Sequence, residues 1–181
     1  MKYIIASDIH GSAEDCEKLL EFYEKSKADR LVLLGDLLYH GPRNDPPSGY
    51  NTKTVAGMLN QYASKIYSVH GNCDADVDQK VLDFPIQADY LILTESDKAI
   101  FATHGHLYNC GHLPPIEGID ILLTGHTHVP ACEKNIDYLY INPGSVGIPK
   151  GGSCKSFMTM QENHLQWHSL DDGHVYMQYD F

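Results

Sequence analysis

The segment KYIIASDIHGS, residues 2–12, sets a pattern that the rest of the chain repeats. Its first part, Lys2–Ala6, is typical of a buried strand, because it is a short apolar run with few polar interruptions. The run leads into a carboxylate, an imidazole and a glycine, namely Asp8, His10 and Gly11. Glycine lets the backbone turn sharply there. The segment therefore predicts a strand that ends in a tight turn carrying two metal-type ligands.

The same combination follows four later apolar runs. The turns that follow those runs contain Gly35-Asp36, His70-Gly71-Asn72-Cys73-Asp74, Thr103-His104-Gly105-His106 and Gly125-His126-Thr127-His128. A single Asp-x-His or His-x-His pair is weak evidence, because such pairs also occur as ordinary exposed residues. In open α/β layers, however, binding sites form beyond the carboxyl ends of the strands. The joint pattern therefore predicts that these strand ends converge on one cleft.

The first half of the chain alternates strands with helices. Apolar residues recur with helical spacing from Cys16 to Tyr23, after Ser12 as a candidate N-cap, and a second helix is expected from Thr52. The order β-α-β-α-β favours a parallel layer with right-handed crossovers. After Asp76, short apolar segments separated by turns predict a second, more antiparallel sheet packed on the first. We expect residues 1–181 to form a single domain, because no linker or internal repeat interrupts them.

The composition indicates the cellular compartment in which we expect the protein. Hydrophobic residues make up 43% of the chain, and no apolar run approaches the roughly 20 residues of a membrane span. The apolar stretch at the N-terminus is too short for a signal peptide. The five cysteines include no C-x-x-C pair, which argues against a disulfide framework and a structural zinc site. We therefore expect a cytoplasmic protein without a membrane partner.

Charge narrows the kind of ligand. The net charge is −11, and only two of the 13 cationic residues are arginines. A protein that grips nucleic acid through its phosphates should be basic, so the composition disfavours a nucleic-acid partner. If the cleft receives a phosphate, metal ions are the obvious source of local positive charge. The 11 histidines of the chain point the same way.

Taken together, the strand-end motifs resemble the signature of calcineurin-like metallophosphoesterases, and in particular that of the YfcE-like bacterial phosphodiesterases. The motifs are Asp8-x-His10, Gly35-Asp36, Gly71-Asn72, Thr103-His104-Gly105-His106 and Gly125-His126-x-His128, and the stretches Ser7–Ser12, Leu34–Asn44 and Asn142–Gly152 extend the likeness. The resemblance implies an α/β sandwich (α+β): two mixed β-sheets packed face to face and flanked by helices, the metallophosphoesterase fold.

The resemblance also implies a dinuclear metal site. One cation would be held by Asp8, His10 and His128, and the other by Asn72, His104 and His126, with Asp36 bridging the two. Imidazole, carboxylate and amide ligands suit Mn²⁺, Zn²⁺, Fe²⁺ or Ni²⁺. The family leans towards Mn²⁺, so two Mn²⁺ ions are the expected cofactors, with Zn²⁺, Fe²⁺ and Ni²⁺ as the alternatives.

The expected reaction is hydrolysis of a small phosphodiester. Two cations about 3.5–4 Å apart can share a hydroxide that attacks phosphorus, so no nucleophilic side chain is needed. Four positive charges, reduced by Asp8, Asp36 and the hydroxide, leave one, which matches a diester. A dianionic monoester would also be attracted, so a phosphomonoesterase remains an alternative. A Vps29-like protein-interaction scaffold is another, although a scaffold has no need to keep every ligand.

Several further residues have weaker signals. Many relatives carry histidine at the position of Cys73, where it can protonate the leaving group; a thiol donates poorly, so Cys73 is at most a weak catalytic candidate. Asp74 would orient that histidine in relatives and is expected only to cap a turn here. Arg43 and His40 are candidates for substrate binding, through a guanidinium fork on a phosphate oxygen for Arg43; a role in stabilising the loop is the alternative for both. Both a monomer and a homo-oligomer fit the composition.

Overall fold

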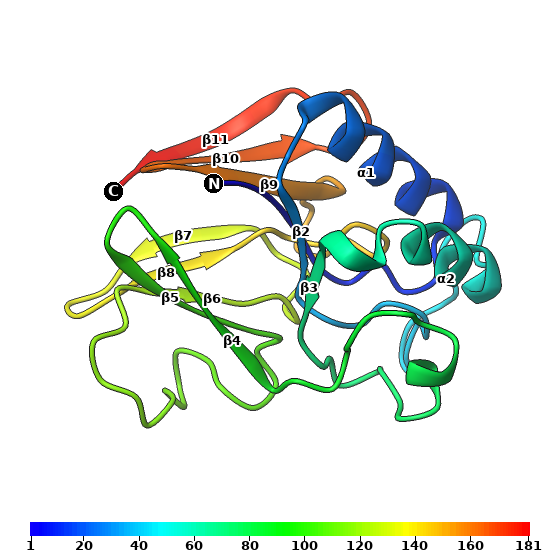
Figure 1. The fold of residues 1–181 in the computed structure, drawn as a ribbon, viewed down its shortest axis with the longest axis horizontal. Helices are drawn as coiled ribbons and strands as arrows, with labels where there is room; N and C mark the ends of the chain where they lie inside the picture. Colours follow the sequence, from blue (N-terminus) through cyan, green and yellow to red (C-terminus); the bar gives the residue numbers. More distant parts are fainter.

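The computed structural model describes residues 1–181, which form two β-sheets packed face to face (Figure 1). One sheet has six strands in the order β11-β10-β9-β1-β2-β3, and the other has five in the order β4-β5-β6-β8-β7. The elements are β1 (Lys2–Ala6), α1 (Ala13–Ser26), β2 (Arg30–Leu33), α2 (Thr52–Asn60), β3 (Ile66–Ser68), β4 (Tyr90–Glu95), β5 (Lys98–Thr103), β6 (Ile121–Leu123), β7 (Ala131–Lys134), β8 (Leu139–Asn142), β9 (Ser156–Gln161), β10 (His164–Ser169) and β11 (Val175–Asp180). The predicted pair of mixed sheets is confirmed.

Alternation along the central strands separates two cores. Ile4 and Leu31 point to one face of the six-stranded sheet and pack in a cluster with residues of α1 and α2. Ile5 and Val32 point to the other face and pack in a cluster between the two sheets. Successive residues of a strand face opposite sides, so one apolar strand can serve both clusters. The helices thus cover the six-stranded sheet, as Figure 1 shows for α1 and α2.

The prediction that the strands after Asp76 form the second sheet is wrong for the last three. β9 pairs antiparallel with β1, placing Met160 opposite Tyr3, and β10 and β11 extend the same sheet outward. The sequence analysis also did not predict β7, whose residues are partly or fully exposed. A short amphipathic strand shows the same alternation whichever sheet it joins, so its pairing depends on distant residues.

The helix starts differ in detail from the expectation. Ser12 does occupy the N-cap position of α1, but its hydroxyl donates to the Asp15 carboxylate and no side chain caps the helix. The second helix is capped by Asn51, whose Oδ1 accepts a hydrogen bond of 3.0 Å from the Thr54 amide, and Thr52 is its first residue. Neither α1 nor α2 has the length and apolar character of a membrane-spanning helix.

Parallel pairing explains how distant segments reach one place. β1, β2 and β3 run parallel in one sheet, and β5, β6 and β8 run parallel in the other. The carboxyl ends of parallel neighbours lie at the same edge of a sheet. The loops after β1, β2 and β3 therefore meet the loops after β5 and β6.

Candidate metal centre

The predicted ligands all lie in these convergent loops. Asp8 and His10 follow β1, Asp36 follows β2, and Asn72 follows β3, while the other sheet contributes the three histidines His104, His126 and His128. Asp8, His10, Asp36, His104 and His128 are buried, and Asn72 and His126 line the open side of the cleft. The structure thus brings together all of the ligand positions named from the sequence.

Five of these residues have a left-handed backbone. The φ angles are 57° at Asp8, 50° at His10, 55° at Asp36, 65° at His126 and 61° at His128, out of nine non-glycine residues with positive φ in the chain. This conformation costs roughly 1–2 kcal/mol for an L-residue, although Asp and His tolerate it better than most. Neighbouring loops hold the strain, since the His10 amide donates to the Asp36 carbonyl at 2.9 Å. Such concentrated strain is typical of functional sites.

Asp8, His10 and His128 form a first cluster, in which three acceptor atoms carry no hydrogen. The Nδ1 atoms of His10 and His128 face the backbone carbonyls of Tyr39 and Ile148, so each Nδ1 must carry the hydrogen. The Nε2 lone pairs of the two rings then face each other at 3.3 Å. Asp8 Oδ1 lies 3.2 Å from His128 Nε2 and is buried without a hydrogen-bond partner. A divalent cation between these converging buried acceptors would satisfy all of them.

Asn72, His104 and His126 form a second cluster, in which acceptor atoms also face one another. His104 Nδ1 faces the Leu34 carbonyl oxygen at 2.6 Å, which leaves Nε2 as a bare acceptor. That atom lies 3.0 Å from Asn72 Oδ1 and 3.2 Å from His126 Nδ1. Two of these three atoms, at least, have no hydrogen to donate. The site again fits a cation.

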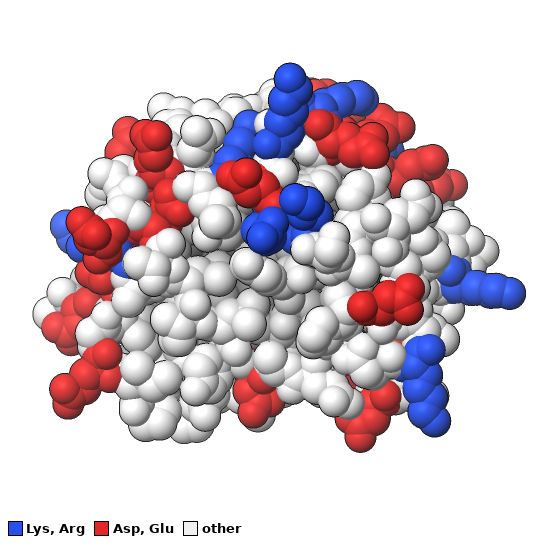
Figure 2. Space-filling view, viewed as in Figure 1, with Lys and Arg blue, Asp and Glu red and all other residues white.

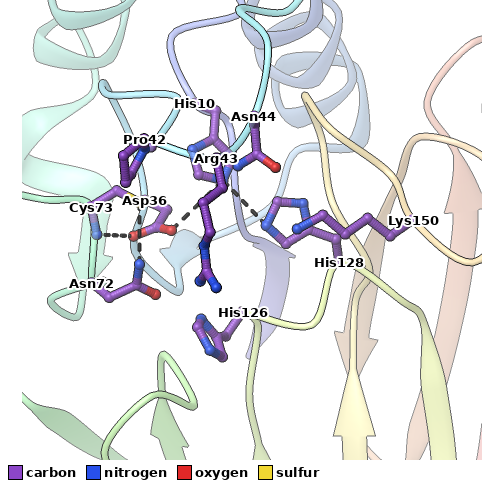
Figure 3. Close-up of a pocket in the computed structure, with 11 residues that line it drawn as sticks. His10, Asp36, Pro42, Arg43, Asn44, Asn72, Cys73, His126, His128 and Lys150 are labelled. Carbon is purple, nitrogen blue, oxygen red and sulfur yellow. Dashed lines mark hydrogen bonds and ion pairs between the residues drawn. The ribbon is translucent and has the colours of Figure 1, made fainter.

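Asp36 lies between the two clusters. Its Oδ2 is 3.6 Å from His10 Nε2 and 3.5 Å from His104 Nε2, so one carboxylate oxygen reaches both groups. Figure 3 shows Asp36 among His10, Asn72 and Cys73. The seven donors, all oxygen or imidazole nitrogen, therefore fit a pair of borderline divalent cations that share one carboxylate.

The electrostatics of the cluster favour positive charge. Burial alone would raise the pKa of Asp8, but the imidazoles of His10 and His128 outweigh it and hold the pKa well below its usual value. Burial likewise opposes protonation of His10, yet Asp8 and Asp36 raise its pKa. Burial and then His104 lower the pKa of His126, which keeps that ring in the neutral, coordinating form. The Asp8 carboxylate is therefore ionised at neutral pH.

Asp74 does more than the turn capping expected of it. Its two carboxylate oxygens accept 2.8 Å hydrogen bonds from the backbone amides of Asp36, Leu37 and Gly71. The neighbouring Cys73 amide donates to Asp36 Oδ1 at 2.8 Å. The turn after β3 thus fixes both the backbone and the side chain of Asp36. The Cys73 thiol lies beside Asp36, and burial first, then Asp36, raises its pKa to about 12.

The turn after β8, for which the sequence analysis predicted no role, supports the ligand loops from behind. Ser145 Oγ donates to the Asp8 carbonyl and accepts from the Ile148 amide, both at 2.9 Å. The buried Asn142 amide donates to the Gly125 carbonyl at 2.7 Å. The stretch Asn142–Gly152 was part of the family resemblance, and the fold adds the hydrogen bonds by which Asn142 and Ser145 support the ligand loops.

The clusters open into a cleft of about 460 Å³ with eleven lining residues, one of them hydrophobic. Arg43 lines this cleft, whereas His40 does not. The His40 ring instead packs between Tyr39 and Tyr50, with ring centroids 4.7 and 5.2 Å away. Lys150, which the sequence did not single out, also lines the cleft.

A two-sheet sandwich with imidazole, carboxylate and amide donors gathered at its parallel-strand ends defines the metallophosphoesterase class, whose members use divalent metal ions. The model of the calcineurin-like phosphoesterase superfamily domain matches residues 1–164, and the chain belongs to this family.

Relatives agree with that assignment. The chain is 44% identical to phosphodiesterase YfcE of Escherichia coli K12, over 98% of this chain and 97% of the relative. It is 30% identical to the probable metallophosphoesterase YsnB of Bacillus subtilis, over 87% and 82% of the two chains. The solved structure of the E. coli phosphoesterase Yfce superposes with a TM-score of 0.95 at 43% identity, covering 99% of each chain. Vps29 of Cryptosporidium parvum has a TM-score of 0.65 at 20% identity, over 99% and 98% of the chains, which shows a shared fold alone.

Proposed function

We propose that this chain is a metal-dependent phosphodiesterase that hydrolyses small phosphodiesters at a dinuclear centre. Asp8, His10 and His128 hold one divalent cation, Asn72, His104 and His126 hold the other, and Asp36 bridges them. One observation carries the proposal. Imidazole nitrogens face one another at close range, and the buried Asp8 Oδ1 beside them has no hydrogen-bond partner. Mn²⁺ is the proposed metal, since the donor set is mixed and borderline.

The residues of the chain have limited chemical roles in this reaction. Bound divalent cations supply Lewis acidity and lower the pKa of water, which provides the nucleophile. Asp36 fixes the spacing of the centre, and Asp74 and Cys73 hold Asp36 through their hydrogen bonds. The Cys73 thiol, with a pKa of about 12, is protonated at neutral pH and is a weak acid. The chain therefore offers no strong proton donor at this position for a leaving alkoxide.

Two arguments support a preference for diesters over monoesters: the net charge of the metal centre and the similarity to a phosphodiesterase. The one positive charge that remains at the centre matches a diester, and a full-length relative at 44% identity is a phosphodiesterase. The test compares bis(4-nitrophenyl) phosphate with 4-nitrophenyl phosphate on purified, Mn²⁺-loaded protein. We expect the diester to be cleaved faster. A clear preference for the monoester would support a phosphomonoesterase, and no hydrolysis of either would favour a scaffold.

The missing proton donor predicts a leaving-group preference. Aryl oxides leave without prior protonation, so we expect 4-nitrophenyl methyl phosphate to lose its aryl group and dimethyl phosphate to remain intact. In the variant Cys73→His, an imidazole at this point should raise the rate on an alkyl diester by about a hundredfold. An alkyl diester cleaved as fast as an aryl diester by the wild type, under saturating metal, would contradict this part of the proposal.

A further inference from the structure

Two cationic side chains enter the cleft from different loops. Arg43 comes from the loop between β2 and α2, and Lys150 from the loop between β8 and β9. Figure 3 shows the Arg43 side chain extended towards His126, and the Lys150 side chain beside His128. Four other lysines, Lys18, Lys25, Lys98 and Lys155, form ion pairs with carboxylates. Arg43 and Lys150 form none, so their charges are available to a ligand.

The turn that carries Arg43 is held in place. His40 and Asn44 exchange two hydrogen bonds across it, one between His40 Nδ1 and the Asn44 carbonyl at 2.9 Å and one from Asn44 Nδ2 to the His40 carbonyl at 2.8 Å. Gly41 has a φ of +84°, and a Cβ there would lie 3.0 Å from Cys73 Sγ. The turn is therefore packed against the cleft wall, and its position is set before a ligand arrives.

The backbone of Lys150 is tied to a proposed metal ligand. Its amide donates to the His128 carbonyl at 3.2 Å, and its own carbonyl accepts from Ser153 Oγ at 2.7 Å. Two glycines with positive φ, Gly151 and Gly152, complete this turn. The position of the ammonium group is thus coupled to the same loop that places His128.

These charges exceed what a simple diester needs. The protein carries a net charge of −11, and on the face drawn in Figure 2 the basic side chains lie scattered among acidic ones without a continuous basic patch. Within the proposed centre, two dications, Asp8, Asp36 and a hydroxide already balance one monoanionic phosphodiester. Arg43 and Lys150 add two further positive charges. Only one of the eleven lining residues is hydrophobic, so an apolar ester arm would find little surface to pack against.

We propose that Arg43 and Lys150 form a second anion subsite beside the metal centre. The physiological substrate is then a phosphodiester whose non-leaving arm carries a further anionic group, a phosphoryl or a carboxylate. This inference rests on the proposed function for the position of the scissile phosphate. Guanidinium and ammonium groups make charge-assisted hydrogen bonds to either kind of anion.

The test uses two diesters that share one leaving group. They are 4-nitrophenyl phenyl phosphate and 4-nitrophenyl 4-carboxyphenyl phosphate, and release of 4-nitrophenol by Mn²⁺-loaded protein is followed. We expect kcat/KM to favour the carboxylated diester by about tenfold, which corresponds to one charged hydrogen bond. Arg43→Ala and Lys150→Ala should each shrink that ratio, and Arg43→Lys should keep part of it. Lys53→Ala, which removes an exposed lysine of α2, should leave the ratio unchanged.

A binding measurement separates this inference from the proposed function. Benzylphosphonate and 4-carboxybenzylphosphonate are titrated into the metal-loaded protein by calorimetry. Tighter binding of the carboxylated compound, lost in Arg43→Ala, would support the subsite even if neither diester were hydrolysed and the proposed function failed. Equal affinity for the two compounds, or a preference that survives in both alanine variants, would overturn the subsite even if both diesters were hydrolysed.

Discussion

The strand-end loops around the cleft and the antiparallel strands β9, β10 and β11 follow opposite physical rules. The loops contain left-handed Asp and His residues and a buried Asp8 oxygen without a hydrogen-bond partner. The antiparallel strands bury Met158, Leu165 and Trp167 completely, and Trp167 Nε1 donates to the Asn142 carbonyl at 2.7 Å. No buried side-chain polar atom of these strands lacks a hydrogen-bond partner.

The difference teaches where the protein depends on something outside its own chain. Hydrophobic burial stabilises the antiparallel strands without help. The loops keep strain and unpaired acceptors that a bound cation would satisfy, so metal binding should contribute to their stability. Changes that affect the two regions separately therefore test the comparison.

Asp36→Asn should have the largest effect. It removes the shared anion and weakens both metal sites, so we expect kcat/KM on bis(4-nitrophenyl) phosphate to fall by about a thousandfold, or ~4 kcal/mol. Asp45→Asn, an equal charge change at an exposed residue of the same loop between β2 and α2, serves as the control. Full activity in Asp36→Asn would refute the bridging role.

Metal removal should destabilise the folded protein through its loops. A cation at about 100 times its Kd stabilises the folded state by roughly 2.7 kcal/mol, so chelation should lower the unfolding temperature. Leu165→Ala should cost about 2–5 kcal/mol through a cavity between the sheets. Because Leu165 lies in the core between the sheets, we expect the same cost with and without metal. A chelator that leaves thermal unfolding of the wild type unchanged would contradict the comparison.

Asp74→Asn should give a smaller loss. An amide nitrogen cannot accept hydrogen bonds, so one or two of the three backbone amides now bound by the carboxylate lose their partner. We expect manganese affinity to weaken by about 10–100-fold, as for other supports of metal ligands. Manganese titration measures this, with Asp83→Asn as an exposed control. Unchanged affinity would mean that the loop positions Asp36 without Asp74.

The smallest effect is expected for His168→Gln, a change in the antiparallel strands that alters how stability depends on pH. Burial lowers its pKa below the usual 6.5, although the Gly173 carbonyl offsets part of the shift. The unfolded chain therefore takes up the proton more readily, and stability is fully present above pH 6.5 and declines as pH falls below it. His168→Gln should flatten this decline in denaturant unfolding between pH 7 and 5, whereas the exposed His112→Gln should not. An identical decline in His168→Gln would show that His168 contributes nothing to it.

The sequence predicted the features that arise locally. An apolar run such as Lys2–Ala6, followed by Asp8 and His10, predicts both a strand and the metal ligands after it. Parallel pairing then brings the ends of such strands together. The partner of β9 depends instead on residues far away along the chain, so its return to β1 was not foreseen. Asp74 belongs to a strand-end motif that predicted only a capping role for it, and Lys150 stands in a short turn without a distinctive local pattern. Their contacts with Asp36 and His128 exist only after the loops have met.

The most direct test of the dinuclear centre is anomalous diffraction from crystals grown with manganese, measured on both sides of the manganese absorption edge. The account predicts two anomalous peaks, one among Asp8, His10 and His128 and the other among Asn72, His104 and His126, with Asp36 in contact with both. A cleft without a peak, or one peak away from Asp36, would contradict it.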